Sequence, residues 1–182
     1  MITRYIQYVR RVCKNLAVVS GFFCLVLVLV TVEQVLARYM FDASSVALQE
    51  LQWHLFAAIF LLAAPYAYAQ NRHVRVDIFL QRCPEHVQDR IEFVGILFFL
   101  LPSMLLLTYY GWEFVQQSRS FTSTVDYGVF TWLLGGEGSP NPGGLPARWI
   151  LKCCIPLSSG LLILESFAKL FEIMTGERSS HA

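Results

Sequence analysis

The sequence predicts an all-α integral membrane protein with four transmembrane helices and an N-terminal amphipathic interfacial helix. Of the 182 residues, 55% are hydrophobic and 15% are charged, whereas about a quarter of a soluble domain is charged. The apolar residues also come in blocks, since residues 16–32 and 93–112 contain no charged side chain. About 20 apolar residues in a helix cross the roughly 30 Å hydrocarbon core of a bilayer.

The N-terminal segment, residues 1–15, has the pattern of an amphipathic helix. Its apolar side chains recur at spacings of three and four, and its basic side chains fill the other face. Such a helix is suited to lying in the headgroup plane, with phospholipids as partners. The alternative is a simple cytoplasmic extension of the first span. The apolar run that follows is longer than a signal-peptide core, so we expect an uncleaved first span.

A single membrane domain, residues 1–182, is expected to hold four spans. They cover about residues 16–39, 47–70, 91–115 and 149–171. Proline is tolerated inside such helices when neighbours satisfy the freed carbonyl, which allows Pro65 and Pro102 in the second and third spans.

The fourth span is the least apolar, because charged residues interrupt it. Lys152 is expected to snorkel to the interface, and Glu165 and Lys169 stand four apart on one helix face and are able to pair. Before this span lies an outer loop, residues 119–148, whose glycines and prolines exclude a helix or a central strand over residues 135–146.

Arginine and lysine are unevenly divided between the two sides of the expected bundle. Ten lie on the side of the two termini and four on the other side. Basic residues favour the cytoplasmic side of a membrane. Both termini are therefore expected in the cytoplasm.

A polar segment, "NRHVRVDIF" at residues 71–79, separates two apolar runs and falls in a cytoplasmic loop. Arg75 and Asp77 are two residues apart and point away from each other in an extended chain, so each needs another partner. Lipid phosphate, a backbone amide or a second subunit would serve, and His73 is expected to act as a neutral hydrogen-bonding group. The alternative is a solvated segment that only fixes topology.

The sequence contains no motif that indicates an enzyme. The sequence has no GxSxG, HExxH or phosphate-binding glycine motif, and its cysteines have no zinc-site spacing. We expect no cofactor, and a net charge of +1 gives no reason to expect nucleic acid as a partner. Glu50 and His54 share a helix face, and we interpret them as a polar pair that locks neighbouring helices rather than as a metal site or proton relay.

Charged residues near the outer ends of the spans need partners, because an ionised group in the membrane is costly. We expect Arg38 to pair with Glu50 or Glu33, and Glu113 to join them. The middles of the first and third spans are almost without polar residues, which argues against a pore within this chain.

Three short segments occur together in residues 37–79. An R-Y-x-F turn follows the first span, an acidic start with tryptophan opens the second, and an H-V-R-V-D run ends the unit. The residues concerned are Arg38, Tyr39, Phe41, Glu50, Trp53, His73, Val74, Arg75, Val76 and Asp77, with Trp149 and Pro156 near the start of the last span. These segments resemble the small membrane subunit of TRAP transporters, the DctQ-like family.

The resemblance implies a role in the bacterial inner (plasma) membrane. Members of that family act with a large DctM-like membrane subunit and a periplasmic solute-binding protein in sodium-coupled uptake of organic acids. The small subunit would scaffold the large one, and the residues just named would make structural or partner contacts. Two other functions stay open: a membrane anchor subunit of a respiratory enzyme complex, and a small self-assembling channel.

Overall fold

The computed structural model describes residues 2–70, 84–121 and 135–175. In these ranges every regular element is a helix. The elements are α1 (Ile2–Phe41), α2 (Val46–Ala69), α4 (Glu85–Gly95), η1 (Ile96–Leu100), α5 (Leu101–Ser120), α7 (Trp149–Lys152) and α8 (Cys154–Thr175).

Four helical stretches are long and apolar enough to cross a membrane, which confirms the all-α class and the number of spans. They are Arg4–Phe41, Val46–Ala69, His86–Ser120 and Trp149–Thr175. Each overlaps one expected span, but the first and third are longer than expected.

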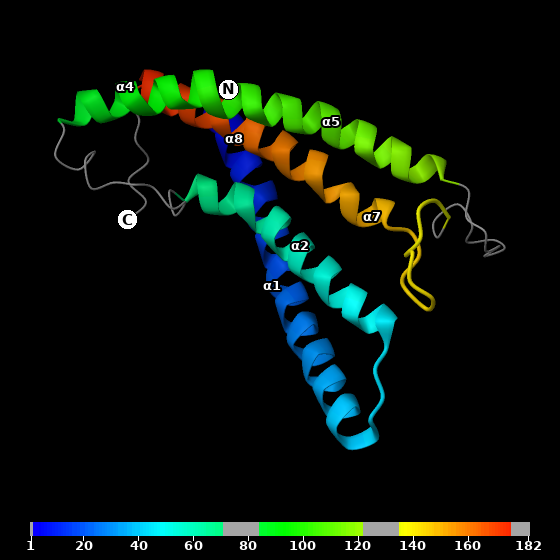
Figure 1. Ribbon diagram of the computed structural model, residues 1–182. Helices are drawn as coiled ribbons and strands as arrows, with labels where there is room; N and C mark the ends of the chain where they lie inside the picture. Colours follow the sequence, from blue (N-terminus) through cyan, green and yellow to red (C-terminus); the bar gives the residue numbers. More distant parts are fainter. Residues whose placement is uncertain (1, 71–83, 122–134, 176–182) are drawn as a thin grey trace.

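The helices form two pairs that diverge from each other (Figure 1). The stretch from α4 to α5 lies beside α7 and α8, whereas α1 and α2 form a hairpin that points away from this pair. α2 packs against α8, and the N-terminal part of α1 crosses α8 as well. α8 therefore contacts all the other long helices and is the centre of the fold.

α1 is one continuous helix of 40 residues, about 60 Å long at 1.5 Å per residue. A separate interfacial helix was expected at residues 1–15, but no glycine or proline interrupts the backbone before Gly21. Val9 and Cys13, on the apolar face of that segment, are buried, with 3% and 0% of their surface exposed. Part of the amphipathic face thus serves contact with α8, and the N-terminal segment is continuous with the helix of the first span. Its expected position in the headgroup plane stays a prediction.

The third span changes its helical geometry just before Pro102. Residues Ile96–Leu100 form a π-helical turn, η1, between α4 and α5. Proline has no N–H to donate and its ring crowds the carbonyl four residues earlier. The wider π turn, which is often found at such points, accommodates the proline without breaking the span.

The fourth span is interrupted at Cys153, between α7 and α8. Pro156 cannot donate a hydrogen bond to the carbonyl of Lys152, so the regular pattern is lost for one residue. The next amide, that of Leu157, bonds the Cys153 carbonyl at 3.2 Å and restores the helix.

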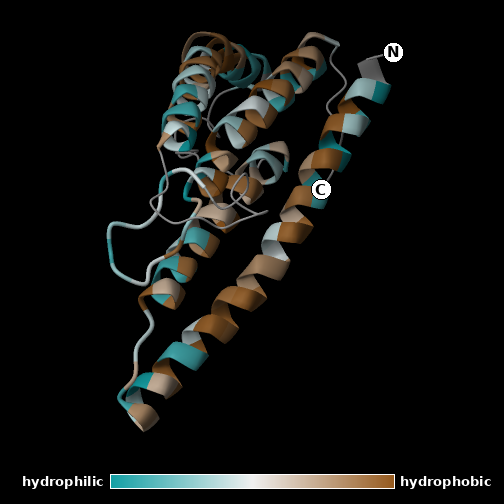
Figure 2. Cartoon of the chain, turned by 90° about the vertical axis from the view of Figure 1, so that its right-hand side faces the viewer, coloured by the Kyte–Doolittle hydropathy of each residue, from teal (hydrophilic) through white to brown (hydrophobic). Residues whose placement is uncertain are grey.

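Small residues bring the helices together inside the bundle. Gly111 of α5 faces α8 so closely that an added Cβ would lie 3.2 Å from Ile155 Cγ2 and 3.4 Å from Pro156 Cδ. Hydroxyl groups also join the helices. Between α5 and α8, Thr108 Oγ1 lies 2.8 Å from Ser159 Oγ, and between α8 and α2, Ser158 Oγ donates to the Leu61 carbonyl at 2.6 Å. Figure 2 shows α1 as a mostly apolar helix with hydrophilic residues near both ends, whereas the other helices carry both kinds along their length.

Candidate functional site

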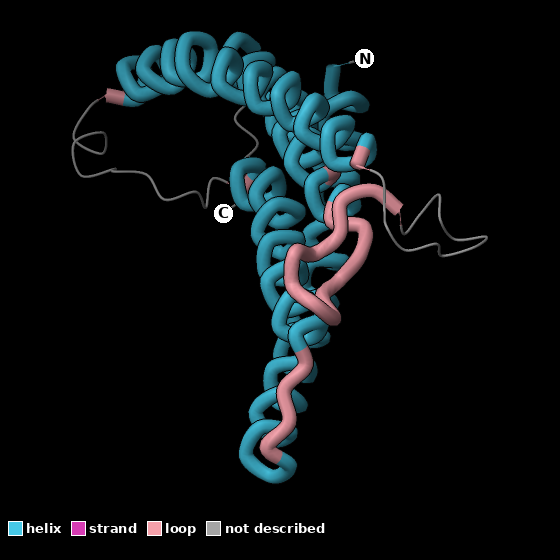
Figure 3. The backbone as a smooth tube through the Cα atoms, turned by 45° about the vertical axis from the view of Figure 1, so that its right-hand side comes forward, coloured by secondary structure: helices cyan, strands magenta, loops and turns pink. Residues whose placement is uncertain are grey.

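Glu50, in the first turns of α2, holds a loop whose contacting residues lie 89–95 positions further along the sequence. Ser139 Oγ donates to Glu50 Oε1, Asn141 Nδ2 lies 3.4 Å from the same oxygen, and the Leu145 amide donates to Oε2 at 2.9 Å. We call this arrangement the Glu50 clamp. The clamp ties loop 135–148 to the second span. Figure 3 shows this loop in pink, folded back along the helices.

The loop is shaped to receive this carboxylate by its own hydrogen bonds. The Ser139 amide donates to the Leu145 carbonyl at 3.0 Å, and the Gly144 amide donates to the Asn141 carbonyl at 3.1 Å. Gly143 has a φ of +78°, which glycine adopts without strain. At Gly144 a Cβ would lie 2.3 Å from Ser139 Cβ and 2.9 Å from Glu50 Oε2, so only glycine leaves room for the carboxylate.

A second junction, centred on Glu137, joins the same loop to α5 and α7. The Glu137 carboxylate forms an ion pair with Lys152 and accepts a hydrogen bond from Ser118 Oγ at 2.8 Å. Its backbone also takes part, since its amide donates to the Ser118 carbonyl at 2.8 Å and its carbonyl accepts from the Arg148 amide at 2.9 Å. The hydrogen bond from Lys152 is the largest influence that holds the pKa of Glu137 below its ordinary value, against the opposing effect of burial.

Aromatic rings cover the cations of this junction. The Arg119 guanidinium lies 4.8 Å from the centre of the Trp149 ring, and the Lys152 ammonium lies 3.9 Å from that of Phe114. Such contacts stabilise a cation near a membrane interface. Lys152 was expected to snorkel to the interface, which stays a prediction. Its side chain is 15% exposed, because Glu137 and Phe114 engage its ammonium group.

The Glu137 junction predicts a pH dependence. Because the pKa of Glu137 is lowered on folding, its stabilising effect is complete above the ordinary value of 4.5 and is lost as the pH falls through the folded pKa. Wild type is expected to melt at a higher temperature than Glu137→Gln at pH 7, with the difference shrinking below pH 4.5. Melting curves of both proteins in detergent measure this, and a difference that is constant with pH would contradict it.

At the opposite end of α8, a buried charge network joins α8 to α1 and α4. Arg10 Nε lies 3.3 Å from Glu165 Oε1, and Arg10 Nη2 lies 2.7 Å from Glu172 Oε2. Glu165 has no exposed surface. Glu165 and Lys169 were expected to be able to pair, but the ion pair of Glu165 within the described residues is with Arg10. The Lys169 ammonium lies 3.9 Å from Glu92 Oε1 and over the Tyr68 ring. Tertiary packing therefore overrides the local i, i+4 pairing.

The expected cluster of charges near Arg38 does not form. Glu50 is engaged by the loop, and within the described residues neither Glu33 nor Glu113 forms an ion pair with Arg38. Arg38 is exposed at the end of α1. The expectation was wrong because loop hydrogen bonds, which the sequence pattern does not show, satisfy Glu50.

Glu50 and His54 do not pair through their side chains. His54 Nδ1 donates instead to the backbone carbonyl of Glu50 at 2.7 Å. Both residues line a pocket of about 240 Å³ at the start of α2, together with Trp53, Asn141 and Arg148. Trp53 is 77% exposed and therefore contributes little to packing within the chain. In the described ranges no group of three or more His, Cys, Asp or Glu side chains is placed to hold a metal ion.

The remaining expected contact residues have different outcomes. Trp149 and Pro156 make the internal contacts described above, with Arg119 and Gly111. His73, Arg75 and Asp77 lie outside the described residues, so their expected roles remain predictions. Sequence reasoning missed Ser139, Asn141, Glu137 and Arg10, and the paired glycines at 143–144 were the signal for a tightly folded loop.

One comparison with known families gives a match over most of the chain. The model of the family described as "Tripartite ATP-independent periplasmic transporters, DctQ component" matches residues 27–176. The matched range contains the Glu50 clamp, the Glu137 junction and Glu165. No curated protein matches the sequence.

Proposed function

Because the chain belongs to the DctQ family of tripartite ATP-independent periplasmic transporter components, we propose that this small permease subunit scaffolds the large subunit during sodium-coupled uptake of an organic acid. It is a multi-pass membrane protein of a transporter family, not of an enzyme family. In this role it braces the permease and forms no substrate path of its own.

The use of the polar side chains supports this proposal. The Glu50 clamp fixes a loop to α2, the Glu137 junction fixes it to α5 and α7, and Arg10 joins α1 to α8. Each of these groups serves to hold one element of the chain against another. A protein built to carry a solute needs polar groups facing a pathway, whereas a brace needs rigid joints between its helices.

The outward surface supports a role beside another membrane protein. Large apolar side chains are exposed along each of the long helices, among them Phe22, Phe60 and Phe98 at 63–69%. In the proposed complex, lipid covers part of this surface and the large DctM-like subunit covers another part. A periplasmic solute-binding protein delivers the substrate to the assembled pair.

Transport measurements test the scaffold role. Vesicles that contain both membrane subunits and the solute-binding protein are expected to take up substrate with a sodium gradient, and vesicles without this chain are expected to show no uptake above background. Calorimetry of the isolated chain with candidate organic acids is expected to show no heat of binding. Specific micromolar binding to the isolated chain would refute the scaffold role.

Orientation in the bacterial inner membrane is a separate prediction. The distribution of basic residues predicts both termini in the cytoplasm and loop 135–148 in the periplasm. Single cysteines at Gly138 and His86, both exposed, are introduced after the native cysteines are replaced by alanine. A membrane-impermeant thiol reagent applied to intact spheroplasts is expected to label position 138 and leave position 86 unlabelled. The reverse pattern would show that the orientation is inverted.

A further inference from the structure

A groove lies at the tip of the α1–α2 hairpin, where α1 ends and α2 begins. Its volume is about 500 Å³, and most of the residues that line it are polar or charged. The polar residues that matter here are Arg38, Asp42, Gln34, Ser44, Gln49 and Gln52. None of them belongs to the Glu50 clamp or to the Glu137 junction.

The groove contains two opposite charges that do not neutralise each other. Within the described residues, neither the Arg38 guanidinium nor the Asp42 carboxylate forms an ion pair. Arg38 lies in the last turn of α1, and Asp42 follows the helix with a φ of 51°. This left-handed conformation keeps Asp42 at the groove rather than in a further helical turn.

The position of the groove is that of a membrane surface. It lies at the end of a helix whose preceding run, residues 16–32, carries no charge. Tyr39, Met40 and Phe41 are 84%, 70% and 75% exposed beside it. Exposed aromatic residues at the end of a span are typical of the headgroup level of a bilayer. The groove therefore meets lipid headgroups whichever way the chain is oriented.

We propose that this groove binds the headgroup of a zwitterionic phospholipid of the phosphatidylethanolamine type. The guanidinium of Arg38 takes the phosphate, for which its planar set of donors is suited. The carboxylate of Asp42 takes the ammonium group, and the amides of Gln34, Gln49 and Gln52 supply neutral hydrogen-bonding groups around them. The bound lipid covers the tip of the hairpin, which diverges from the rest of the fold (Figure 1).

The pair of charges selects against other headgroups. A purely anionic headgroup, such as that of phosphatidylglycerol, satisfies Arg38 but leaves Asp42 unpaired and repelled. A headgroup with both charges satisfies the two side chains at once. The groove is thus expected to prefer phosphatidylethanolamine over phosphatidylglycerol, although both bring a phosphate.

Native mass spectrometry of the purified, delipidated complex of the two membrane subunits tests this proposal. Each lipid is titrated separately, and the dissociation constant of the tightest site is compared among variants. Arg38→Gln is expected to weaken phosphatidylethanolamine binding at least about tenfold, as for the loss of one charge-assisted hydrogen bond. Arg11→Gln, an exposed arginine near the other end of α1, is the matched control and is expected to change nothing at this site.

Asp42→Asn tests the ammonium contact separately. Asparagine tolerates the left-handed backbone at this position, so the variant is expected to fold normally. It should weaken binding of phosphatidylethanolamine but not of phosphatidylglycerol, which removes the preference. Unchanged lipid binding in Arg38→Gln, or an equal loss in Arg11→Gln, would overturn the proposal. So would a loss of large subunit from the complex with lipid binding unchanged, because a protein would then occupy the groove.

Discussion

Replacing Arg10 with alanine is expected to lower the free energy of unfolding by about 3–5 kcal/mol, the usual cost of removing one partner of a buried ion pair. Glu165 has no exposed surface, and within the described residues its Oε2 atom has no hydrogen-bond partner. Arg10 lies 3.3 Å from its other oxygen. Without Arg10, the carboxylate stays buried in the bundle without its closest cation.

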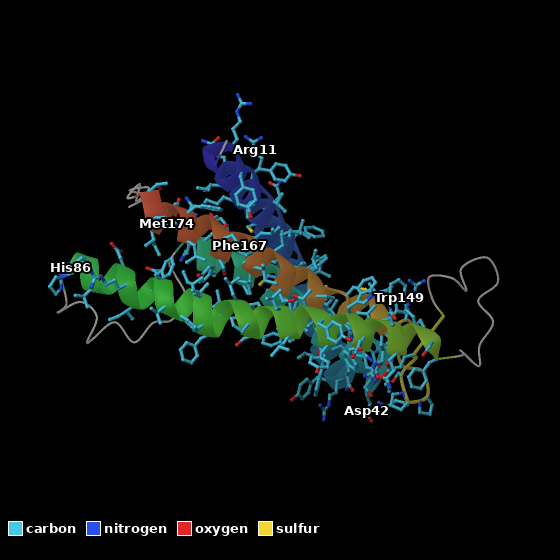
Figure 4. All side chains as sticks on the ribbon, turned by 90° about the horizontal axis from the view of Figure 1, so that it is seen from above. Arg11, Asp42, His86, Trp149, Phe167 and Met174 are labelled. Atoms are coloured by element: carbon cyan, nitrogen blue, oxygen red, sulfur yellow. The ribbon has the colours of Figure 1, made fainter. Side chains whose placement is uncertain are left out.

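The neighbouring residue offers a matched control for this change. Arg11 is exposed, and its side chain extends away from the helices in Figure 4, so Arg11→Ala is expected to alter stability by less than about 0.5 kcal/mol. Chemical denaturation in detergent, followed by circular dichroism, measures both variants.

Removing the charges of both Arg10 and Glu165 distinguishes the cost of an unpaired buried charge from the cost of lost side-chain packing. Arg10→Leu combined with Glu165→Leu is expected to be less destabilising than Arg10→Ala, because the fully buried charge of Glu165 is then removed together with its partner, and only the partly exposed Glu172 loses an ion pair. Equal stability of Arg10→Ala and Arg11→Ala would show that the network contributes nothing to the fold.

The four spans were predictable because a bilayer requires long apolar helices, and long runs of apolar residues can be recognised in the sequence alone. Their ends were less predictable, since helix continuation depends on the backbone and on neighbours. Residues 2–15 carry a pattern that suits either a membrane surface or another helix. The structure shows that part of this face contacts the bundle, because Val9 and Cys13 are buried.

Ion-pair partners were the least predictable part of the structure. Arg38 with Glu50, and Glu165 with Lys169, were reasonable by proximity along the chain. In the structure, Glu50 accepts hydrogen bonds from Ser139 and Leu145. Glu165 pairs with Arg10, which is 155 residues away in sequence. Such choices depend on how helices cross, and no spacing rule within one helix contains that information.

The loop before the last span was recognised from its glycines and prolines, but its purpose was not. Composition indicates where a chain turns and not which side chain the turn encloses. The acidic start of the second span and the glycine pair of the loop are separate features in the sequence. They become one structural unit only when α2 and α8 are packed together.

Gly144→Ala is expected to open the Glu50 clamp. The new Cβ would lie 2.3 Å from both Cβ and Oγ of Ser139, and 2.9 Å from Glu50 Oε2. Ser139 must then move away, and its hydrogen bond to the carboxylate is lost. A hydrogen bond to a charged group stabilises by about 1.5–3 kcal/mol, so exchange of the loop amides should become roughly ten to a hundred times faster.

Hydrogen exchange followed by mass spectrometry of the loop peptides measures this opening. The amides of Ser139, Gly144 and Leu145 are bonded within the clamp and should report it. Gly138→Ala is the matched control, because a Cβ there meets nothing within 4 Å and the exchange rates should stay those of the wild type. Glu50→Gln should fall between the two, since it keeps the shape of the side chain but removes its charge. If Gly144→Ala and Gly138→Ala exchange alike, the loop does not depend on Glu50 for its conformation.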